Sequence, residues 1–131
     1  MGLSQAIAAH HLIINVVNDQ VAAAGVVSVG EDPTYRHVPW HHHFADNQIG
    51  VLHLFAVDQP FRGHGIAQQT LQAIFNWFRE HGQRVLHLDI IDPNVPAEKV
   101  YRQAGFIFVN TQLLDYSDLG PTPAKLFEYR L

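Results

Sequence analysis

The chain has 131 residues, a formal net charge of −4, no cysteine, and 47% hydrophobic against 15% charged residues. Length and apolar content predict one folded domain over residues 1–131 and exclude a disordered chain. The acidic balance argues against nucleic acid as a partner, and the lack of cysteine excludes disulfides, thiolate metal sites and a cysteine nucleophile. No apolar run approaches the ~18 residues of a membrane span, and the start lacks a signal-peptide pattern. We therefore expect a soluble cytoplasmic protein without a membrane partner.

The first part of the chain predicts a hairpin and then a long loop. Ser4–His11 contains weak helix formers and predicts a helical turn or two. His11–Val17 and Val21–Val29 are rich in Ile and Val and predict two antiparallel strands joined by a turn. The small residues 22–25 predict close packing of the second strand against another element. Glu31–Gln48 carries two prolines and predicts an irregular loop.

The rest of the chain alternates strands and helices. Ile49–Val57 is apolar on both faces, as in a strand in the middle of a sheet. Gly65–His81 has an apolar stripe with helical spacing. The remaining expected elements are a strand at Arg84–Ile91, a short helix at Pro96–Ala104, a strand at Phe106–Leu114, a polar loop at Asp115–Pro123 and a strand at Lys125–Leu131. This order predicts a single α/β domain with a mixed sheet.

The segment Arg62–Ala67, with the sequence Arg-Gly-His-Gly-Ile-Ala, joins a buried strand to the start of a helix. A helix start leaves about four backbone N–H groups unpaired and carries a partial positive charge. Glycines let an anion approach such amides closely, and Arg62 adds a fixed charge. The segment therefore predicts a phosphate-binding loop, with an ordinary turn as the alternative. It is neither a P-loop nor a dinucleotide fingerprint, because the Lys-Ser/Thr pair and the third glycine are missing.

The segment Val57–Ala67 resembles the acetyl-CoA loop of the GNAT N-acetyltransferase superfamily, in which Arg62, Gly65 and Ala67 fill the fixed places of Arg/Gln-x-x-Gly-x-Gly/Ala. A second segment, Asn94-x-x-Ala97-x-x-Val100-Tyr101-x-x-x-Gly105-Phe106, is similar to another element of that family. Leu126–Leu131 is similar to its closing strand, so the resemblance runs from about Leu12 to Leu131. It implies a GNAT-like fold.

The resemblance also implies residue roles. The strand end would hydrogen-bond the pantetheine arm through its backbone, the loop would bind the pyrophosphate, and Asn94 would contact the cofactor near the opening between two strands. Tyr101 would be the general acid that protonates the departing thiolate. The residues assigned to acetyl-CoA in this way are Phe55, Ala56, Val57, Arg62, Gly63, His64, Gly65, Ile66, Ala67, Gln68 and Asn94.

Two of these interpretations have structural alternatives. Tyr101 shares a helix face with apolar residues, so it could be a core aromatic whose hydroxyl is satisfied. His53 stands on the buried strand four residues before Val57, as either a half-buried core histidine or the base that deprotonates the acceptor amine. Some arylalkylamine acetyltransferases of the family look similar at this place.

The run His41-His42-His43 suggests three interpretations: an exposed loop, a wall of the acceptor pocket, or a metal site with His37. Neighbouring residues of an extended segment point to opposite sides, and the spacing matches no specific zinc pattern. We therefore expect no metal ion.

Only about eleven residues precede the first predicted strand, whereas the resemblance implies a strand and one or two helices there. We expect most of this first strand and helix to be missing, which would leave sheet surface uncovered and suggests a homodimer.

The resulting hypothesis is an acetyl-CoA-dependent N-acetyltransferase that transfers the acetyl group directly, in a ternary complex, to a small-molecule or protein amine. The alternative is a non-catalytic acyl-CoA-binding or sensing module. Both predict cofactor binding, but only the enzyme predicts release of free thiol in the presence of an amine.

Overall fold

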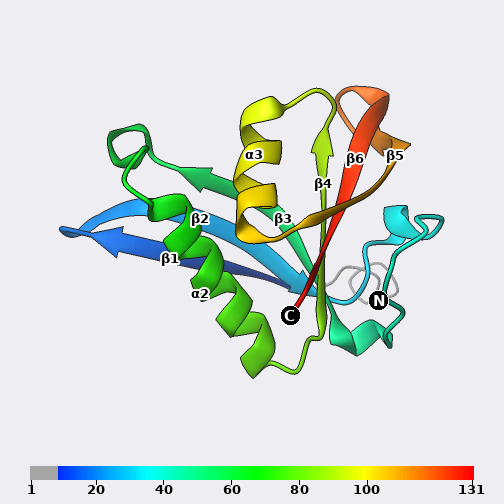
Figure 1. Ribbon diagram of the computed structural model, residues 1–131, viewed down its shortest axis with the longest axis horizontal. Coiled ribbons are helices and arrows are strands. Elements are labelled where there is room, and N and C mark those ends of the chain that lie inside the picture. Colours follow the sequence, from blue (N-terminus) through cyan, green and yellow to red (C-terminus); the bar gives the residue numbers. More distant parts are fainter. Residues whose placement is uncertain (1–8) are drawn as a thin grey trace.

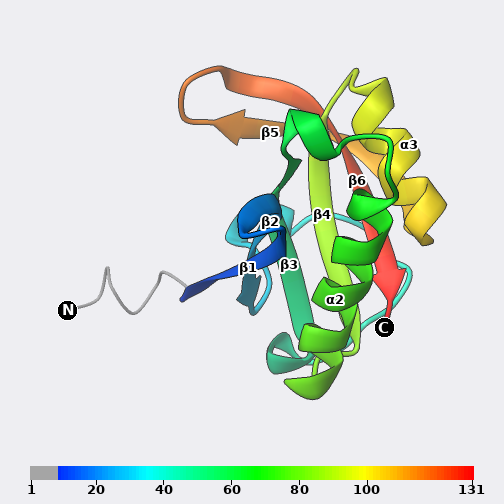
Figure 2. The ribbon, with the colours of Figure 1, turned by 90° about the vertical axis from the view of Figure 1, so that its left-hand side faces the viewer.

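The computed structural model describes residues 9–131, which form a six-stranded sheet with two helices on one face (Figures 1 and 2). The strands lie in the order β1-β2-β3-β4-β6-β5, and all neighbours are antiparallel except β3 and β4. The mixed α/β sheet predicted from the sequence is confirmed. In chain order the strands and helices are β1 (His10–Val17), β2 (Gln20–Val29), β3 (Ile49–Val57), α2 (Ile66–Glu80), β4 (Val85–Ile91), α3 (Val95–Ala104), β5 (Ile107–Tyr116) and β6 (Gly120–Arg130).

Two expectations about local structure need comment. The helical turn predicted for Ser4–His11 lies mostly outside the described residues, and its last two residues begin β1. The polar loop predicted for Asp115–Pro123 is wrong, because β5 and β6 continue through most of it as a hairpin. Pro121 and Pro123 are compatible with this strand because their nitrogens point away from β5. The Pro123 carbonyl accepts a hydrogen bond from the amide of Asp92, the residue just past the end of β4. The two proline nitrogens therefore face the side of β6 where β4 has ended and no backbone N–H is required.

Small residues allow α2 to lie close to the sheet, as the run at 22–25 predicted. A Cβ atom built on Gly25 would lie 2.7 Å from Cδ1 of Ile74, and one on Gly50 would overlap the Phe78 ring. Ile74 and Phe78 are fully buried in the main core, together with Leu71 and Phe75 of the predicted helical stripe. This packing fixes where the first turn of α2 stands relative to β3.

β3 and β4 run side by side only at their beginnings. Their pairing extends from Ile49 with Val85 to Val51 with His87, and beyond this point the strands diverge (Figure 1). α3 follows β4 directly and packs on the same face as α2. The divergence therefore opens a gap in the middle of the sheet next to both helices.

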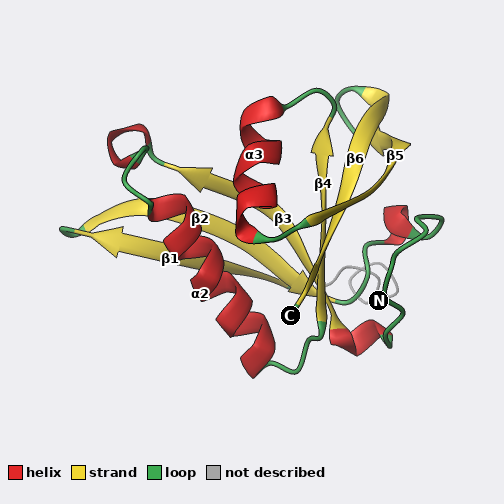
Figure 3. Ribbon diagram, viewed as in Figure 1, coloured by secondary structure: helices red, strands yellow, loops and turns green. Residues whose placement is uncertain are grey.

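The helix-free face of the sheet is covered on one half only. The long loop between β2 and β3 contains two short helical turns (Figure 3). It packs on β4, β5 and β6 and buries Tyr35 and Trp40. Over β1 and β3, large apolar side chains stay exposed, among them Leu12 (66%) and Leu54 (69%). The homodimer stays a prediction, and this surface is where it would form.

Among residues 9–131, no helix is long and apolar enough to cross a membrane.

Candidate active site

A pocket of about 720 Å³ opens where β3 leaves β4. Three pieces of chain form its walls: the end of β3, the loop that leads into α2, and one face of α3. The lining residues are Phe55, Ala56, Val57, Phe61, Arg62, Gly63, Gly65, Ile66, Ala67, Gln68, Pro96, Ala97, Lys99, Val100, Tyr101 and Gln103. The two sequence motifs that lie some thirty residues apart thus meet in one cavity.

The loop into α2 presents unpaired backbone amides to this pocket. Gly63 and Gly65 have φ angles of 81° and 76°, in the left-handed region that favours glycine. The first helical hydrogen bond runs from the Gln69 amide to the Gly65 carbonyl, so within the described part of the chain the N–H groups of residues 63–68 have no acceptor. Unpaired amides at a helix start form a site for an anion such as a pyrophosphate. Arg62 is held beside them by a 3.1 Å bond from its Nε to the Val57 carbonyl.

The end of β3 also offers free backbone groups. The Asp58 amide donates to Ala22 of β2 at 2.8 Å, and backbone groups alternate sides along a strand. The N–H and C=O groups of Phe55 and the N–H group of Val57 therefore face the gap that β4 has left, whereas the Val57 carbonyl already accepts from Arg62. An amide-containing chain such as the pantetheine arm could pair with them like an added strand.

The structure brings most of the predicted cofactor residues together, with two exceptions. His64 is exposed on the loop and does not line the pocket. Asn94 does not line it either: its Oδ1 accepts from the Ala97 amide at 3.2 Å and caps the start of α3. Its place in the motif is thus explained by helix capping, and its contact with the cofactor stays a prediction.

Tyr101 has a buried ring and an unbonded hydroxyl. The ring packs between Phe55 and Phe106, with centroids 6.3 and 5.6 Å away, and the residue is 8% exposed. It lines the pocket, and no described residue hydrogen-bonds to its hydroxyl. Burial, with a contribution from the Asp89 carboxylate, raises the pKa of Tyr101 to about 12, so the phenol carries its proton at neutral pH. The core ring foreseen as the structural alternative is present, but its hydroxyl has no hydrogen-bond partner among residues 9–131.

His53 lies on the opposite face of the sheet from Tyr101. β3 has a β-bulge there, since Val26 of β2 pairs with Leu54 while Val27 pairs with Leu52. His53 Nε2 is 2.6 Å from the Ser28 Oγ, and its ring lies 4.5 Å from that of His10. Burial and then the His10 charge lower the pKa of His53, which keeps the ring neutral and able to accept a proton. The side chain is half-buried, as the first interpretation held, and its role as the base stays a prediction.

Sequence reasoning missed a carboxylate beside the same gap. Asp89 on β4 accepts hydrogen bonds from the hydroxyls of Tyr35, in the long loop, and Tyr116, at the end of β5. Burial is the main cause that raises the pKa of both tyrosines, and the Asp89 carboxylate adds to it. Only the strand register would have revealed this group, because its partners are 54 and 27 residues away in the chain.

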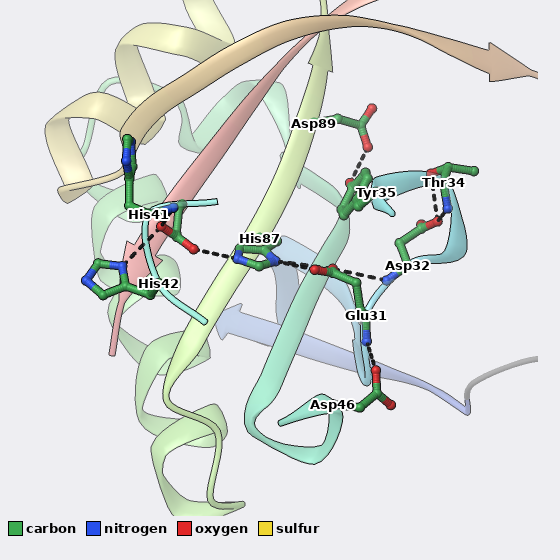
Figure 4. A network of polar contacts seen from close by, with 10 residues as sticks. Glu31, Asp32, Thr34, Tyr35, His41, His42, Asp46, His87 and Asp89 are labelled. Atoms are coloured by element: carbon green, nitrogen blue, oxygen red, sulfur yellow. Dashed lines mark hydrogen bonds and ion pairs between the residues drawn. The ribbon is translucent and has the colours of Figure 1, made fainter. Parts of the chain in front are cut away.

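A second polar network fixes the long loop to the sheet (Figure 4). His87 is 1% exposed, with Nδ1 2.9 Å from Glu31 and Nε2 2.7 Å from Glu128. The Trp40 ring stacks on it at 3.5 Å. Burial disfavours charge on His87, but the hydrogen bonds to Glu128 and Glu31 outweigh it and raise its pKa. With a carboxylate at each ring nitrogen, His87 is bound as an imidazolium.

The histidine run takes part in this network rather than in the pocket. His42 Nδ1 lies 3.1 Å from Glu128 Oε1, and the His41 amide donates to the same oxygen. His41 and His43 are exposed. The run is therefore a partly exposed loop, as the first interpretation held, with the His42 ring and the His41 amide bonded to one buried carboxylate. In the described part of the chain, no group of three or more His, Asp or Glu side chains could hold a metal ion.

Comparison with known proteins points to one family. Residues 4–106 match the family model described as Acetyltransferase (GNAT) family. The chain is 27% identical over 104 residues to the uncharacterised N-acetyltransferase YdgE of Bacillus subtilis (strain 168), an alignment that covers 79% of this chain and 60% of the relative. It is 37% identical over 59 residues to the uncharacterised N-acetyltransferase YycN of the same organism, covering 45% of this chain and 38% of the relative. The match thus spans less than two thirds of either relative.

Solved structures share the fold. An acetyltransferase of the GNAT family from Streptococcus agalactiae superposes with a TM-score of 0.72 at 17% identity, covering 90% of this chain and 64% of that one. A GNAT family acetyltransferase from Elizabethkingia anophelis, solved with acetyl-CoA bound, superposes with a TM-score of 0.69 at 15% identity, covering 93% and 76%.

Proposed function

Because the chain belongs to the GNAT acetyltransferase family, we propose that it transfers the acetyl group of acetyl-CoA directly to a primary amine. One observation carries this proposal: a single pocket joins the free amides at the start of α2 to the unbonded hydroxyl of Tyr101. The amides suit a pyrophosphate and the hydroxyl suits the leaving thiolate, so the pocket has both ends of an acyl-CoA site.

The residues present fit acetyl-CoA. The loop 62–68 would hold the pyrophosphate with its N–H groups, and Arg62 would add a positive charge at the entrance. The gap-facing groups of Phe55 and Val57 would align the pantetheine arm towards the divergence of β3 and β4. There the thioester would lie between the helix face, with Tyr101, and the helix-free face, with His53.

The transfer then needs one bond made, one bond broken and two proton movements. The amine nitrogen bonds to the thioester carbonyl carbon, and a β3 amide that faces the gap stabilises the charge on the carbonyl oxygen. As the carbon–sulfur bond breaks, Tyr101 gives its proton to the departing sulfur. His53 takes the proton that the amine nitrogen loses. Since the chain has no cysteine, direct transfer without a thiol acyl-enzyme is the route we propose.

We expect the protein to release free thiol from acetyl-CoA only when an amine is present. The measurement follows thiol formation with a panel of primary alkylamines and basic peptides, each compared with an amine-free control. Tight binding of acetyl-CoA with no amine-dependent thiol release would instead favour a non-catalytic acyl-CoA-binding module. The panel includes both small amines and peptides because the residues that line the pocket are assigned to acetyl-CoA and do not indicate the size of the acceptor.

A further inference from the structure

The side chain of Gln68 joins the two helices that form walls of the pocket. Its Nε2 donates a hydrogen bond of 3.1 Å to the carbonyl of Val100 in α3. Both residues are partly buried and line the pocket. Among residues 9–131, no other hydrogen bond connects α2 with α3. Because a carbonyl oxygen has two lone pairs, Val100 can accept this bond and keep its place in the helix.

This hydrogen bond lies next to the general acid of the proposed reaction. Tyr101 follows Val100 directly and is the only buried residue of α3. The other apolar residues of α3 that pack on the main core are only partly buried, namely Ala97, Val100 and Ala104. An ion pair of 2.8 Å between Glu98 and Lys125 ties α3 to β6 outside the pocket. Packing alone therefore fixes the distance between α3 and the loop only weakly, and Gln68 supplies the polar contact that sets it.

The same residue belongs to the loop that would hold the pyrophosphate. The backbone N–H of Gln68 is one of the amides without an acceptor at the start of α2. A pyrophosphate bound to these amides would fix the first turn of α2. The side chain of Gln68 would then fix Val100, and with it the neighbouring Tyr101. One residue thus contacts the cofactor through its backbone and the helix of the general acid through its side chain.

We propose that Gln68 is a positioning residue, which couples the filling of the pyrophosphate loop to the placement of the Tyr101 hydroxyl beside the departing sulfur. The inference rests on the proposed acetyl transfer and deepens it by naming a residue that acts through the general acid. The Tyr101 hydroxyl has no hydrogen-bond partner among residues 9–131, so its place depends on where α3 lies. A displacement of ~1 Å of a reacting group can cost ~10²-fold in rate, so one hydrogen bond between the two walls affects the reaction.

The first test is the Gln68→Met variant, which keeps an unbranched side chain of similar length but removes the donor. We expect kcat to fall about 10- to 100-fold, because the hydroxyl of Tyr101 is no longer held in place. The KM for acetyl-CoA should change little, because the backbone amides of the loop remain. Gln69→Met is the matched control: Gln69 is exposed, does not line the pocket and accepts from Asn15 of β1. That variant should keep the full kcat.

A double-mutant cycle with Tyr101→Phe separates positioning from a general loss of structure. If Gln68 acts through the Tyr101 hydroxyl, adding Gln68→Met to the Tyr101→Phe protein should lower kcat no further. Three results would overturn the inference: an unchanged kcat in Gln68→Met, a loss that multiplies with the loss from Tyr101→Phe, or a raised KM for acetyl-CoA with the same kcat.

A second readout needs no turnover. The nucleotide 3′-phospho-ADP carries the pyrophosphate of acetyl-CoA without the pantetheine arm, so it would fill the loop but not the space beside Tyr101. With this probe, amide hydrogen exchange should slow in both the loop and α3 of the unmodified protein, and in the loop alone of Gln68→Met. No slowing of α3 in the unmodified protein, or equal slowing in both proteins, would overturn the inference. If the probe slows no amide of the loop, or the unmodified protein releases no thiol with any amine, the proposed function fails instead.

Discussion

Replacing Tyr101 by Phe should lower kcat for acetyl transfer by about 10²- to 10⁴-fold, the usual contribution of a general acid. The change removes only the hydroxyl, which makes no hydrogen bond within the described residues, and keeps the ring against Phe55 and Phe106. Folding and acetyl-CoA affinity should therefore be little affected. The measurement is the steady-state rate of thiol release at saturating acetyl-CoA and amine.

Tyr129→Phe is the matched control for this experiment. Tyr129 stacks on Phe75 at 4.0 Å on the helix side of the sheet and does not line the pocket. Its variant should keep the full rate. A Tyr101→Phe protein with unchanged kcat would show that the thiolate leaves without a proton from this residue, whereas a large loss of acetyl-CoA affinity would assign Tyr101 to binding.

Replacing His87 by Gln should lower the free energy of unfolding by about 3–5 kcal/mol, the usual cost of removing one partner from a buried ion pair. Glu128 is 2% exposed and lies 2.7 Å from His87 Nε2, so it would lose this buried cationic partner. Glu31 would lose its partner at Nδ1, and the Trp40 ring would lose the imidazolium stacked on it. Chemical denaturation at neutral pH measures the difference, with His37→Gln, at an exposed histidine, as the control.

The same network gives the unmodified protein a pH-dependent stability. The pKa of His87 is raised above its ordinary value of 6.5, so its contribution is complete below that pH and is lost as pH rises through the raised value. The pKa of Glu128 is lowered despite burial, by His87 and His42, so its contribution is lost at the acidic end, as pH falls through the lowered value. Melting temperatures should thus decline on the alkaline side, and the decline should be absent in His87→Gln. A parallel decline in both proteins would show that His87 is neutral in the folded state.

Much of the fold could be predicted from the sequence because its signals are local. The apolar stripe of α2, the glycines at both of its ends and the two-sided apolar run of β3 each act within one element. The polar loop predicted after Leu114 failed for a tertiary reason: Pro121 and Pro123 are tolerated in β6 because β4 has ended beside them. That neighbour is not visible from the local sequence.

The candidate site could also be predicted only in part: its contiguous motifs were found, but the groups that the fold brings together from distant segments were not. The residues that bind through their backbone belong to two contiguous motifs, and the structure brings those motifs to one pocket. Asp89 and its tyrosine partners come from three separate elements, so only the sheet register brings them together. The histidine run drew attention as a motif, yet the histidine with the strongest interactions is His87, a single residue within a buried strand.

The most direct test of an acyl-CoA site is a thermal melt with and without acetyl-CoA, beside ATP and NAD at equal concentration. Binding at ~100 times the dissociation constant should stabilise the folded state by about 2.7 kcal/mol. Gly65 and Gly82 flank α2 with φ angles of 76° and 89°, and a Cβ on either meets no atom within 4 Å. Alanine therefore introduces the same backbone strain at both, but only Gly65 belongs to the loop of free amides. We predict a shift specific to acetyl-CoA that Gly65→Ala weakens and Gly82→Ala retains. No shift in the folded protein, or equal shifts with all three ligands, would contradict the account.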